Sequence, residues 1–474
     1  MKFFSKINNF LFPHAKDYPK IGAKKAIALG FQHAFAMSCA TILVPILTGL
    51  DVGVALFAAG LGTLIFHICT GGRMPTFLGS SFAFIAAISG IVGNESFGAT
   101  KEEQISAAMG GIIVAGCFYL LMSLVIKIFG SKFIDKLFPP VVRGVGIALI
   151  GLNLAGAAIN NIQVQYTANG ALTPFNEGYD IPTYVWAWII AGIVALTAIV
   201  LSSYGKGMFK MSSIFIALVA GYVLTLILTK TGIAPASLMD TSSIASFDWF
   251  QVPNFILPSF NISAIAMIAP IAIVTCVEHV GDVYANGAVV GKNFVKKPGL
   301  HRTMLGDGLA TVTAGLLGGP PNTTYSENTA VLAATGNYNP ASLRVAAVIA
   351  ILISFFGKGI GVIETVPDAV LGGACIVLYG MIASVGLRTL VENHVDFTNN
   401  RNLCIAAVML VLAMGGAVIG TPIFSFTTIG LGIIVGIILN LVLPETNKDK
   451  GMIAHIVTDQ ELVPERKPTH NETE

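Results

Sequence analysis

Long apolar segments separated by short polar connections run through most of the 474 residues. A helix needs about 20 consecutive apolar residues to cross the hydrocarbon core of a bilayer. Eleven segments approach or exceed this length, and they are residues 25–47, 52–70, 105–126, 137–157, 184–203, 211–229, 262–285, 341–357, 366–386, 401–420 and 424–443. A twelfth segment, 303–318, is weaker and rich in glycine. The pattern predicts an all-α protein that crosses a membrane many times.

Two further apolar segments, 75–92 and 320–336, are too short and too interrupted to cross a membrane as plain helices. Each opens with proline and polar residues, continues through a short β-favouring stretch, and ends in half a helix. Irregular backbone at membrane depth is tolerated only where protein buries it or where it lines a cavity. Counting both, we predict fourteen transmembrane segments, of which the third and the tenth are broken.

The charged residues support this count. Only 11% of the chain is Asp, Glu, Lys or Arg, against roughly 25% in soluble proteins, so a water-soluble enzyme of this length is excluded. With fourteen segments and a cytoplasmic N-terminus, 24 Lys and Arg residues lie inside and only Lys101, Lys230 and Lys358 lie outside. This bias follows the positive-inside rule. We therefore expect both termini in the cytoplasm, including the polar tail 444–474.

Three sequence similarities recur in the same order in the two halves of the chain. Gln32-His33 matches Glu278-His279, Gly79 to Ala83 matches Asn322 to Ser326, and the spacing of Pro139, Val142 and Gly144 matches that of Pro367, Val370 and Gly372. Each repeat would hold seven segments, so the second repeat enters the membrane upside down. Broken segments at matching places in inverted halves indicate the binding site of a transporter. The alternative is chance similarity among glycine-rich helices.

Four acidic residues lie inside predicted segments: Glu278, Asp282, Asp307 and Glu327. Acidic residues in a membrane span are costly and are usually functional. Glu278 and Asp282 are four residues apart and share one face of their helix. Their repulsion favours a proton on one of them, so this pair is the candidate proton carrier. The alternative is that one of the two is a structural hydrogen-bond acceptor.

The second broken segment offers a place for a neutral, planar ligand. Glu327 lies where the stretch Thr323 to Ser326 turns into a half-helix, so its carboxylate stands beside the free backbone N–H groups of a helix N-terminus. Such donors and acceptors suit a ligand with alternating N–H and C=O groups, for example a pyrimidine. The matching broken segment of the first repeat contains Phe82, whose ring would stack on the ligand or pack in the core. Tyr325 likewise combines a packing face with a hydroxyl.

Other polar residues of these segments suit a supporting role. Asp307 lies in a glycine-rich segment and would bridge helices rather than contact ligand. Gln32 and His33 would orient the core helices. His279 points about 100° away from Glu278 around a helix, which favours a packing role for this histidine.

Several other kinds of chemistry have no signal in the sequence. The chain has no Walker A, HExxH or GxSxG motif, so neither ATP hydrolysis nor hydrolytic catalysis is predicted. Its six cysteines have no CxxC spacing, and we expect no metal site and no cofactor. The net charge of +2 gives no indication of nucleic-acid binding. An ion or proton gradient remains as the source of energy.

Four stretches together resemble the nucleobase–ascorbate transporters, also called nucleobase:cation symporter-2. They are Phe31 to Met37, Leu78 to Phe84, Glu278 to Gly281 and Pro321 to Asn328. The family signature Asn-x-Gly-x-x-x-x-Thr is matched at Asn328 and Thr335, with Ala330 where glycine is usual. The resemblance covers nearly the whole chain and is greatest to the bacterial uracil permeases, which have Glu at the position of Glu327.

The resemblance implies fourteen segments in two inverted seven-span repeats, with short antiparallel strands in the broken segments 3 and 10. The implied domains are a cytoplasmic N-terminal segment 1–24, a core of 25–126 and 262–357, a gate of 137–229 and 366–443, and a cytoplasmic tail 444–474. It also implies the inner membrane of a bacterium, a homodimer formed through the gate domain, and proton-coupled uracil import by alternating access. Uracil would contact Phe82, Glu278, Tyr325, Ser326, Glu327 and, from the gate, Tyr379.

Three positions depart from the uracil permeases. Asp282 stands where those proteins commonly have His, and Ser326 replaces a residue that is often Gly. Asp282 and Asp307 are more similar to the purine-transporting branch. A xanthine-type or broader nucleobase symporter therefore stays open, and so does the choice of Glu278 or Asp282 as the proton carrier. A passive channel or anion carrier with the same architecture is the alternative from another functional class.

Overall fold

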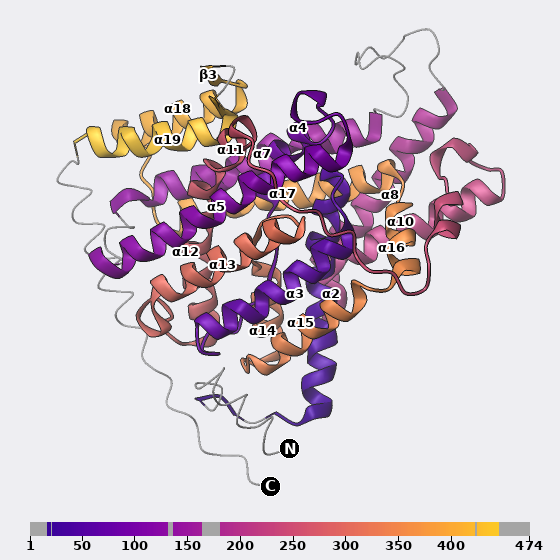
Figure 1. Ribbon diagram of the computed structural model, residues 1–474, viewed down its shortest axis with the longest axis horizontal. Coiled ribbons are helices and arrows are strands. Elements are labelled where there is room, and N and C mark those ends of the chain that lie inside the picture. Colours follow the sequence, from indigo (N-terminus) through magenta and orange to yellow (C-terminus); the bar gives the residue numbers. More distant parts are fainter. Residues whose placement is uncertain (1–16, 20, 131–135, 164–180, 422–423, 445–474) are drawn as a thin grey trace.

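The computed structural model describes residues 17–19, 21–130, 136–163, 181–421 and 424–444, and most of them are helical (Figure 1). The helices of the first half are α2 (Ala23–Thr48), α3 (Val52–Cys69), α4 (Ile85–Ile91), α5 (Lys101–Phe129), α7 (Pro140–Gln163), α8 (Ile181–Tyr204), α9 (Met208–Met211) and α10 (Ser213–Lys230). Those of the second half are α11 (Ile262–Ile268), α12 (Ile271–Val290), α13 (Leu300–Leu317), α14 (Ser326–Thr335), α15 (Ala341–Ile353), α16 (Gly357–Glu364), α17 (Asp368–Glu392), α18 (Asn400–Met414) and α19 (Thr428–Val442). The predicted tail from 445 onward and most of the N-terminal segment lie outside the described residues.

Many of these helices have the length and apolar composition of membrane spans. Eight in the described part of the chain qualify outright, with α11 and α12 taken as one span, Ile262–Val290. Helices α15 and α16 together form a ninth, which is bent by 84° at its break. The protein is therefore a multi-pass membrane protein. The count of fourteen stays a prediction, because the helices of the broken segments, α18 and α19 are shorter than a full span.

The last two apolar segments, 401–420 and 424–443, are less helical than predicted. Helices α18 and α19 have 15 residues each, which is about 22 Å of helix against a hydrocarbon core of about 30 Å. Helix α18 ends at a glycine pair, in which Gly416 has φ of 71°. The chain then forms an antiparallel hairpin of β3 (Val418–Thr421) and β4 (Phe424–Thr427). The apolar composition concealed this hairpin, because Val, Ile and Phe suit a strand as well as a membrane helix.

The two broken segments meet as a pair of antiparallel strands. Strand β1 (Leu78–Ser80) pairs with β2 (Asn322–Thr324), with Gly79 opposite Thr323. Both strands are fully buried. After β1 the chain forms a 3₁₀ turn, Phe82–Phe84, and then α4; after β2 it enters α14. The strand pair therefore brings the starts of two short helices together inside the protein.

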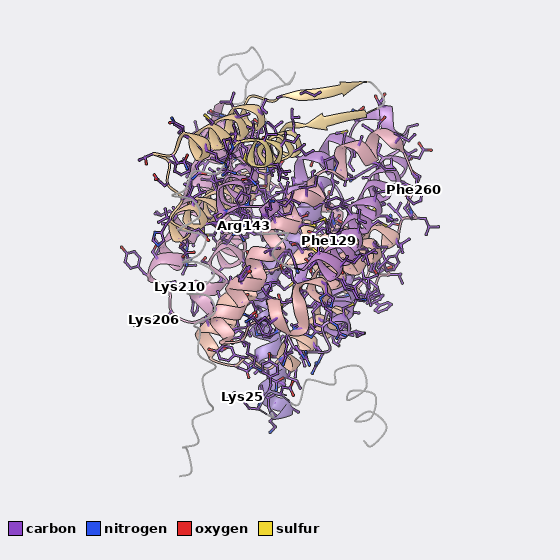
Figure 2. The ribbon with its side chains drawn as sticks, turned by 90° about the vertical axis from the view of Figure 1, so that its left-hand side faces the viewer. Lys25, Phe129, Arg143, Lys206, Lys210 and Phe260 are labelled. Carbon is purple, nitrogen blue, oxygen red and sulfur yellow. The ribbon has the colours of Figure 1, made fainter. Side chains whose placement is uncertain are left out.

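The helices around this strand pair form two groups. In one group α2, α3, α5, α13 and α15 pack on one another, and in the other α7 packs against α17, α17 against α8, and α8 against α10. Glycine allows the closest approach: a Cβ on Gly386 of α17 would lie 2.2 Å from the backbone N of Ala148 on α7. Helix α12 contacts members of both groups, including α5, α13 and α7. In Figure 2, Lys25, Lys206 and Lys210 lie lower in the view than Arg143 and Phe260.

Candidate functional site

The strand pair is held from both sides by backbone hydrogen bonds. Beyond the paired residues, the Tyr325 N–H donates to the Phe77 carbonyl at 3.0 Å, and the Ser81 N–H donates to the Pro321 carbonyl at 2.9 Å. On the α3 side, Thr63 Oγ1 accepts from the Leu78 N–H at 2.9 Å. Buried backbone groups in a membrane protein must find partners inside the protein, and these bonds supply them. They also place the starts of the two half-helices.

The side chain of Tyr325 belongs to this support. Its hydroxyl donates to the Ser80 carbonyl at 2.9 Å and accepts from Thr41 Oγ1 at 3.4 Å. The ring lies against Gly79, where an added Cβ would be 2.5 Å from two ring carbons. Glycine at position 79 is therefore required by this contact. The ring and hydroxyl of Tyr325 are buried in the strand pair.

One stripe of α12 faces the broken segments. Asp282 Oδ2 accepts from Thr324 Oγ1 on β2 at 2.6 Å. One turn further on, Asn286 Nδ2 donates to the Pro75 carbonyl at 2.7 Å and to Thr329 Oγ1 of α14 at 3.2 Å. Glu278 lies one turn before Asp282 on the same face, as its spacing predicts. The two predicted acids of α12 therefore lie on the side of the helix that contacts both broken segments.

Glu327 adds a third carboxylate to this side. It lies in the first turn of α14, and its charge interacts with that of Glu278. Both side chains are half-buried, and neither α12 nor α14 contains a Lys or Arg. The site is thus lined by acids and by the start of a helix. Such a lining suits a neutral ligand with N–H groups or a proton, and it disfavours an anion.

The supporting residues connect helices. Asn328 Nδ2 bonds to both Nδ1 and the carbonyl oxygen of His33 on α2, each at 3.2 Å. The buried His33 thereby holds α14 against α2. Gln32, its half-buried neighbour, lies on the same helix. Asp307 of α13 is fully buried and bonds to His279 of α12.

The remaining predicted residues lie in different surroundings. Phe82 begins the 3₁₀ turn after β1 and is half-buried, in contact with the apolar core. Tyr379 is buried on α17, whose neighbours are α7, α8 and α10. The side chain of Ser326 lies outside the described part of the structure, although its backbone begins α14.

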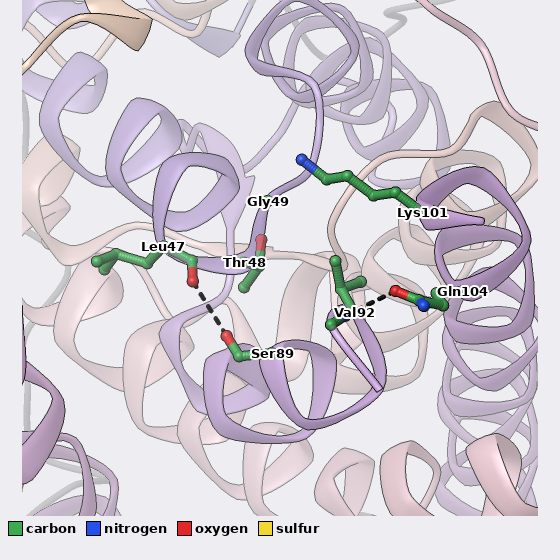
Figure 3. Close-up of a pocket in the computed structure, with 8 residues that line it drawn as sticks. Leu47, Thr48, Gly49, Ser89, Val92, Lys101 and Gln104 are labelled. Atoms are coloured by element: carbon green, nitrogen blue, oxygen red, sulfur yellow. Dashed lines mark hydrogen bonds between the residues drawn. The ribbon is translucent and has the colours of Figure 1, made fainter. Parts of the chain in front are cut away.

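A pocket lies elsewhere, at the end of α2 (Figure 3). Its volume is about 400 Å³, and its lining includes Ser89, Lys101 and Gln104. Two of these polar groups already serve the local structure, since Ser89 Oγ donates to the Leu47 carbonyl at 3.1 Å and Gln104 Oε1 accepts from the Gly93 N–H at 2.7 Å. The pocket is not lined by Glu278, Asp282 or Glu327. Among the described residues, no three His, Cys, Asp or Glu side chains gather as a metal site would require.

The sequence missed several partners of the site residues. Asn286 was detectable, because it continues the i, i+4 spacing of Glu278 and Asp282. Asn328 was already visible as the first residue of the signature. Thr324 gave no such signal, because its bond to Asp282 joins positions 42 residues apart.

Comparison with known proteins places the chain in a family. Residues 24–421 match the Permease family that groups xanthine and uracil permeases. The chain is 40% identical over 421 residues to a probable uracil permease of Haemophilus influenzae, covering 89% of this chain and 95% of that protein. It is 41% identical over 436 residues to the uracil permease of Bacillus caldolyticus, covering 90% of this chain and 94% of that protein.

A solved structure shares the fold at low sequence identity. The murine Solute Carrier 26 family member A9 anion transporter, in the inward-facing state, matches with a TM-score of 0.62 and 14% identity. The match covers 97% of this chain and 72% of that protein. The chain therefore belongs to the Permease family, the nucleobase–ascorbate transporters that its motifs resemble, and it is a membrane transport protein and not an enzyme.

Proposed function

We propose that this protein is a secondary active transporter that imports uracil together with a proton, driven by the proton gradient. The observation that carries the proposal is a group of three carboxylates. Glu278 and Asp282 lie on the side of α12 that contacts both broken segments, and Glu327 lies in the first turn of the neighbouring α14. The uracil permeases among the relatives support uracil as the substrate. No cofactor is needed for this function.

The proposed uracil site combines acceptors and donors. Glu278 and Glu327 accept hydrogen bonds from the N–H groups of the ring, and the backbone N–H of Ser326, next to Tyr325, supplies a donor to one of its carbonyls. Phe82 contributes a ring face, and Tyr379 approaches from the gate. In a water-poor site, each unmatched polar group is costly. A ligand with N–H and C=O groups along its edge is therefore preferred over an apolar one.

The proposed coupling uses the carboxylate pair of α12. Two acids one turn apart in a membrane protein resist being charged together, so a proton on Glu278 or Asp282 accompanies the bound substrate. The bond from Thr324 to Asp282 links this pair to strand β2. Binding at the strand and protonation on α12 thus act on neighbouring atoms.

We also propose the fourteen-span architecture with two inverted repeats, in which 25–126 and 262–357 form the core and 137–229 and 366–443 form the gate. The pairing of β1 with β2, one from each half, supports the repeat. The two groups of packed helices support the division into core and gate. Alternating access would then move the core, with the site, against the gate, and a homodimer would form through the gate. The distribution of Lys and Arg supports cytoplasmic termini in a bacterial inner membrane.

Uptake of labelled uracil tests the coupling. In cells that lack their own nucleobase carriers, a protonophore and the substitution Glu278→Gln should each abolish uptake. Glu95→Gln removes an exposed acid outside the site and serves as the matched control. Undiminished uptake after either treatment would contradict proton coupling through Glu278.

Competition tests the substrate and separates the alternatives. Excess unlabelled uracil should suppress uptake, whereas xanthine and guanine should not. Suppression by xanthine would identify the broader nucleobase symporter that Asp282 and Asp307 leave open. Chloride or bicarbonate in place of nucleobase should have no effect on the unfolding temperature of the purified protein, because the acids disfavour an anion. Stabilisation by these anions would favour the anion carrier.

A further inference from the structure

His279 is bound to α13 through both nitrogens of its ring. Nδ1 lies 2.7 Å from Asp307 Oδ2, and Nε2 lies 2.9 Å from Thr303 Oγ1. All three side chains are fully buried. Thr303 and Asp307 are four residues apart and therefore share one face of α13. A single ring of α12 is thus held at two successive turns of its neighbour.

The hydroxyl of Thr303 can set the donors in this group. A threonine has one hydroxyl hydrogen, and the Leu300 carbonyl lies 3.0 Å from Thr303 Oγ1. A hydroxyl that donates to Leu300 leaves its oxygen to accept the hydrogen of His279 Nε2 at 2.9 Å. In that arrangement the remaining contact, between Nδ1 and Asp307 Oδ2, is bridged by one proton. The His279–Asp307 pair then has a net charge of zero, whichever of the two atoms carries this proton.

The surroundings resist any change in this proton count. Loss of the bridging proton would leave a lone pair of Nδ1 facing a carboxylate oxygen at 2.7 Å, away from solvent. Asp307 Oδ1 is buried and has no hydrogen-bond partner among the described residues. Among the described residues, the other titratable groups whose charges interact with Asp307 are Tyr119 of α5 and Cys276 and Glu278 of α12. None of these groups is a cation that would stabilise a net negative charge on the pair.

We propose that His279, Thr303 and Asp307 form a positioning clamp that fixes the rotation of α12, and that the His279–Asp307 pair keeps its proton and stays neutral during transport. This inference rests on the proposed function. Glu278 is adjacent to His279 and points about 100° away around the helix. The clamp therefore sets the direction of the Glu278 carboxylate toward the site. The transported proton travels on the Glu278 and Asp282 side of α12 and not on the α13 side.

The substitution Asp307→Asn tests the proton count. An asparagine amide donates N–H to Nδ1, so it keeps the neutral contact but cannot exchange a proton. In proteoliposomes, uracil entry and internal acidification give the number of protons per uracil. We expect Asp307→Asn to transport the same number of protons per uracil as the wild type, with the same pH profile of initial uptake. Uracil transport by this variant without protons would overturn the proposal.

The substitution Thr303→Val tests the positioning role, because it removes the acceptor of the Nε2 hydrogen and nearly keeps the shape. We expect KM for uracil to rise about fivefold or more, with a smaller change in the maximal rate, since an unsatisfied buried donor disturbs the clamp. Thr303→Ser restores the acceptor and should restore KM. An unchanged KM in Thr303→Val would exclude the positioning role.

Two further measurements cover failure of a single variant. If Asp307→Asn does not fold, the double variant His279→Leu/Asp307→Leu removes both polar partners together, which buried pairs often tolerate. It should carry protons and uracil in the wild-type ratio, and loss of the protons alone would contradict the inference. Wild-type protein that imports uracil without protons would instead contradict the proposed coupling. Thermal unfolding would then test the clamp by itself. Asp307→Asn should have the unfolding temperature of the wild type, and Asp307→Ala should unfold at a lower temperature.

Discussion

At the scale of single residues, one glycine determines how the strands can meet. Gly79 of β1 lies against the ring of Tyr325, and the Tyr325 hydroxyl reaches the carbonyl of the next residue, Ser80. The contact leaves no room for a side chain at position 79. Tyrosine and glycine thus act as one unit that joins the two broken segments.

The substitution Gly79→Ala should disrupt the contact between position 79 and the ring of Tyr325. Its Cβ would lie 2.5 Å from the ring, so the ring must move, and overpacking of this kind costs about 1–3 kcal/mol of stability. We expect a lower thermal unfolding midpoint in detergent and reduced uracil uptake. Gly192→Ala on α8 is the matched control, because nothing lies within 4 Å of an added Cβ there. Equal midpoints for the two variants would show that the ring contact is dispensable.

The sequence predicted individual site residues better than their partners. Helical periodicity alone puts Glu278 and Asp282 on one face, and the structure places that face toward the broken segments. Periodicity could not predict the bond from His279 to Asp307, because the two residues lie on different helices separated by the connection 291–299. Periodicity favours a packing role for His279, whereas its two specific hydrogen bonds depend on how α12 and α13 cross.

At the scale of elements, the short helices α18 and α19 are connected at both ends. The β3–β4 hairpin joins them at one end. At the other end, Arg401 in the first turn of α18 donates to the carbonyls of Asn440 and Leu443 at 2.8 and 3.2 Å. A guanidinium at the C-terminus of a helix satisfies carbonyls that have no partner within that helix. Arg401 therefore holds the end of α19.

The substitution Arg401→Ala should lower stability by about 1–2 kcal/mol, because charged hydrogen bonds to helix ends are among the stronger polar contacts. The control is Arg388→Ala, which removes an exposed ion pair with Glu392 and should cost less than about 0.5 kcal/mol. Thermal unfolding of both purified variants measures the difference. A larger loss for Arg388→Ala would contradict this assignment of roles.

The elements show which parts of a membrane fold can be predicted from its sequence. The breaks at 75–92 and 320–336 were visible, because Pro, Gly and Thr interrupt the apolar pattern where the strands form. The end of α18 was not visible in the apolar pattern, because Ala417 to Thr421 continues the apolar run of the helix. The 84° bend between α15 and α16 was also missed. Its break at residues 354–356 contains no proline and no glycine.

At the scale of the whole molecule, a mostly apolar seam separates the proposed core from the proposed gate. Helix α12 contributes Val274 and Val277, α7 contributes Val142, Arg143, Gly146 and Ile147, and Ile433 of α19 lies beside them. Apart from Arg143, these residues have no side-chain group that can form a hydrogen bond, so the two surfaces can slide past each other at low cost. The seam is therefore the expected plane of movement in alternating access.

The substitution Gly146→Leu should block this movement while the site stays intact. Gly146 lines the seam together with Val274 and Val277 of α12. On the gate side an added Cβ would already lie 3.2 Å from Ile433, so the longer side chain of leucine would extend into the seam. We expect uptake to fall about tenfold, as ~1.4 kcal/mol on the transport barrier would require. Stabilisation by uracil should persist in thermal unfolding. Gly156→Leu, at an open position of the same helix, is the control, and equal uptake by both variants would exclude the seam as the moving interface.

The strand pair also has a consequence for how the protein is made. Strand β1 leaves the ribosome about 250 residues before β2, an interval of roughly 10 to 50 s at common rates of synthesis. During that time its backbone groups have no partner strand, and lipid offers none. The first half of the nascent chain therefore waits in the membrane with an unpaired edge, and it depends on temporary protection until the second half arrives.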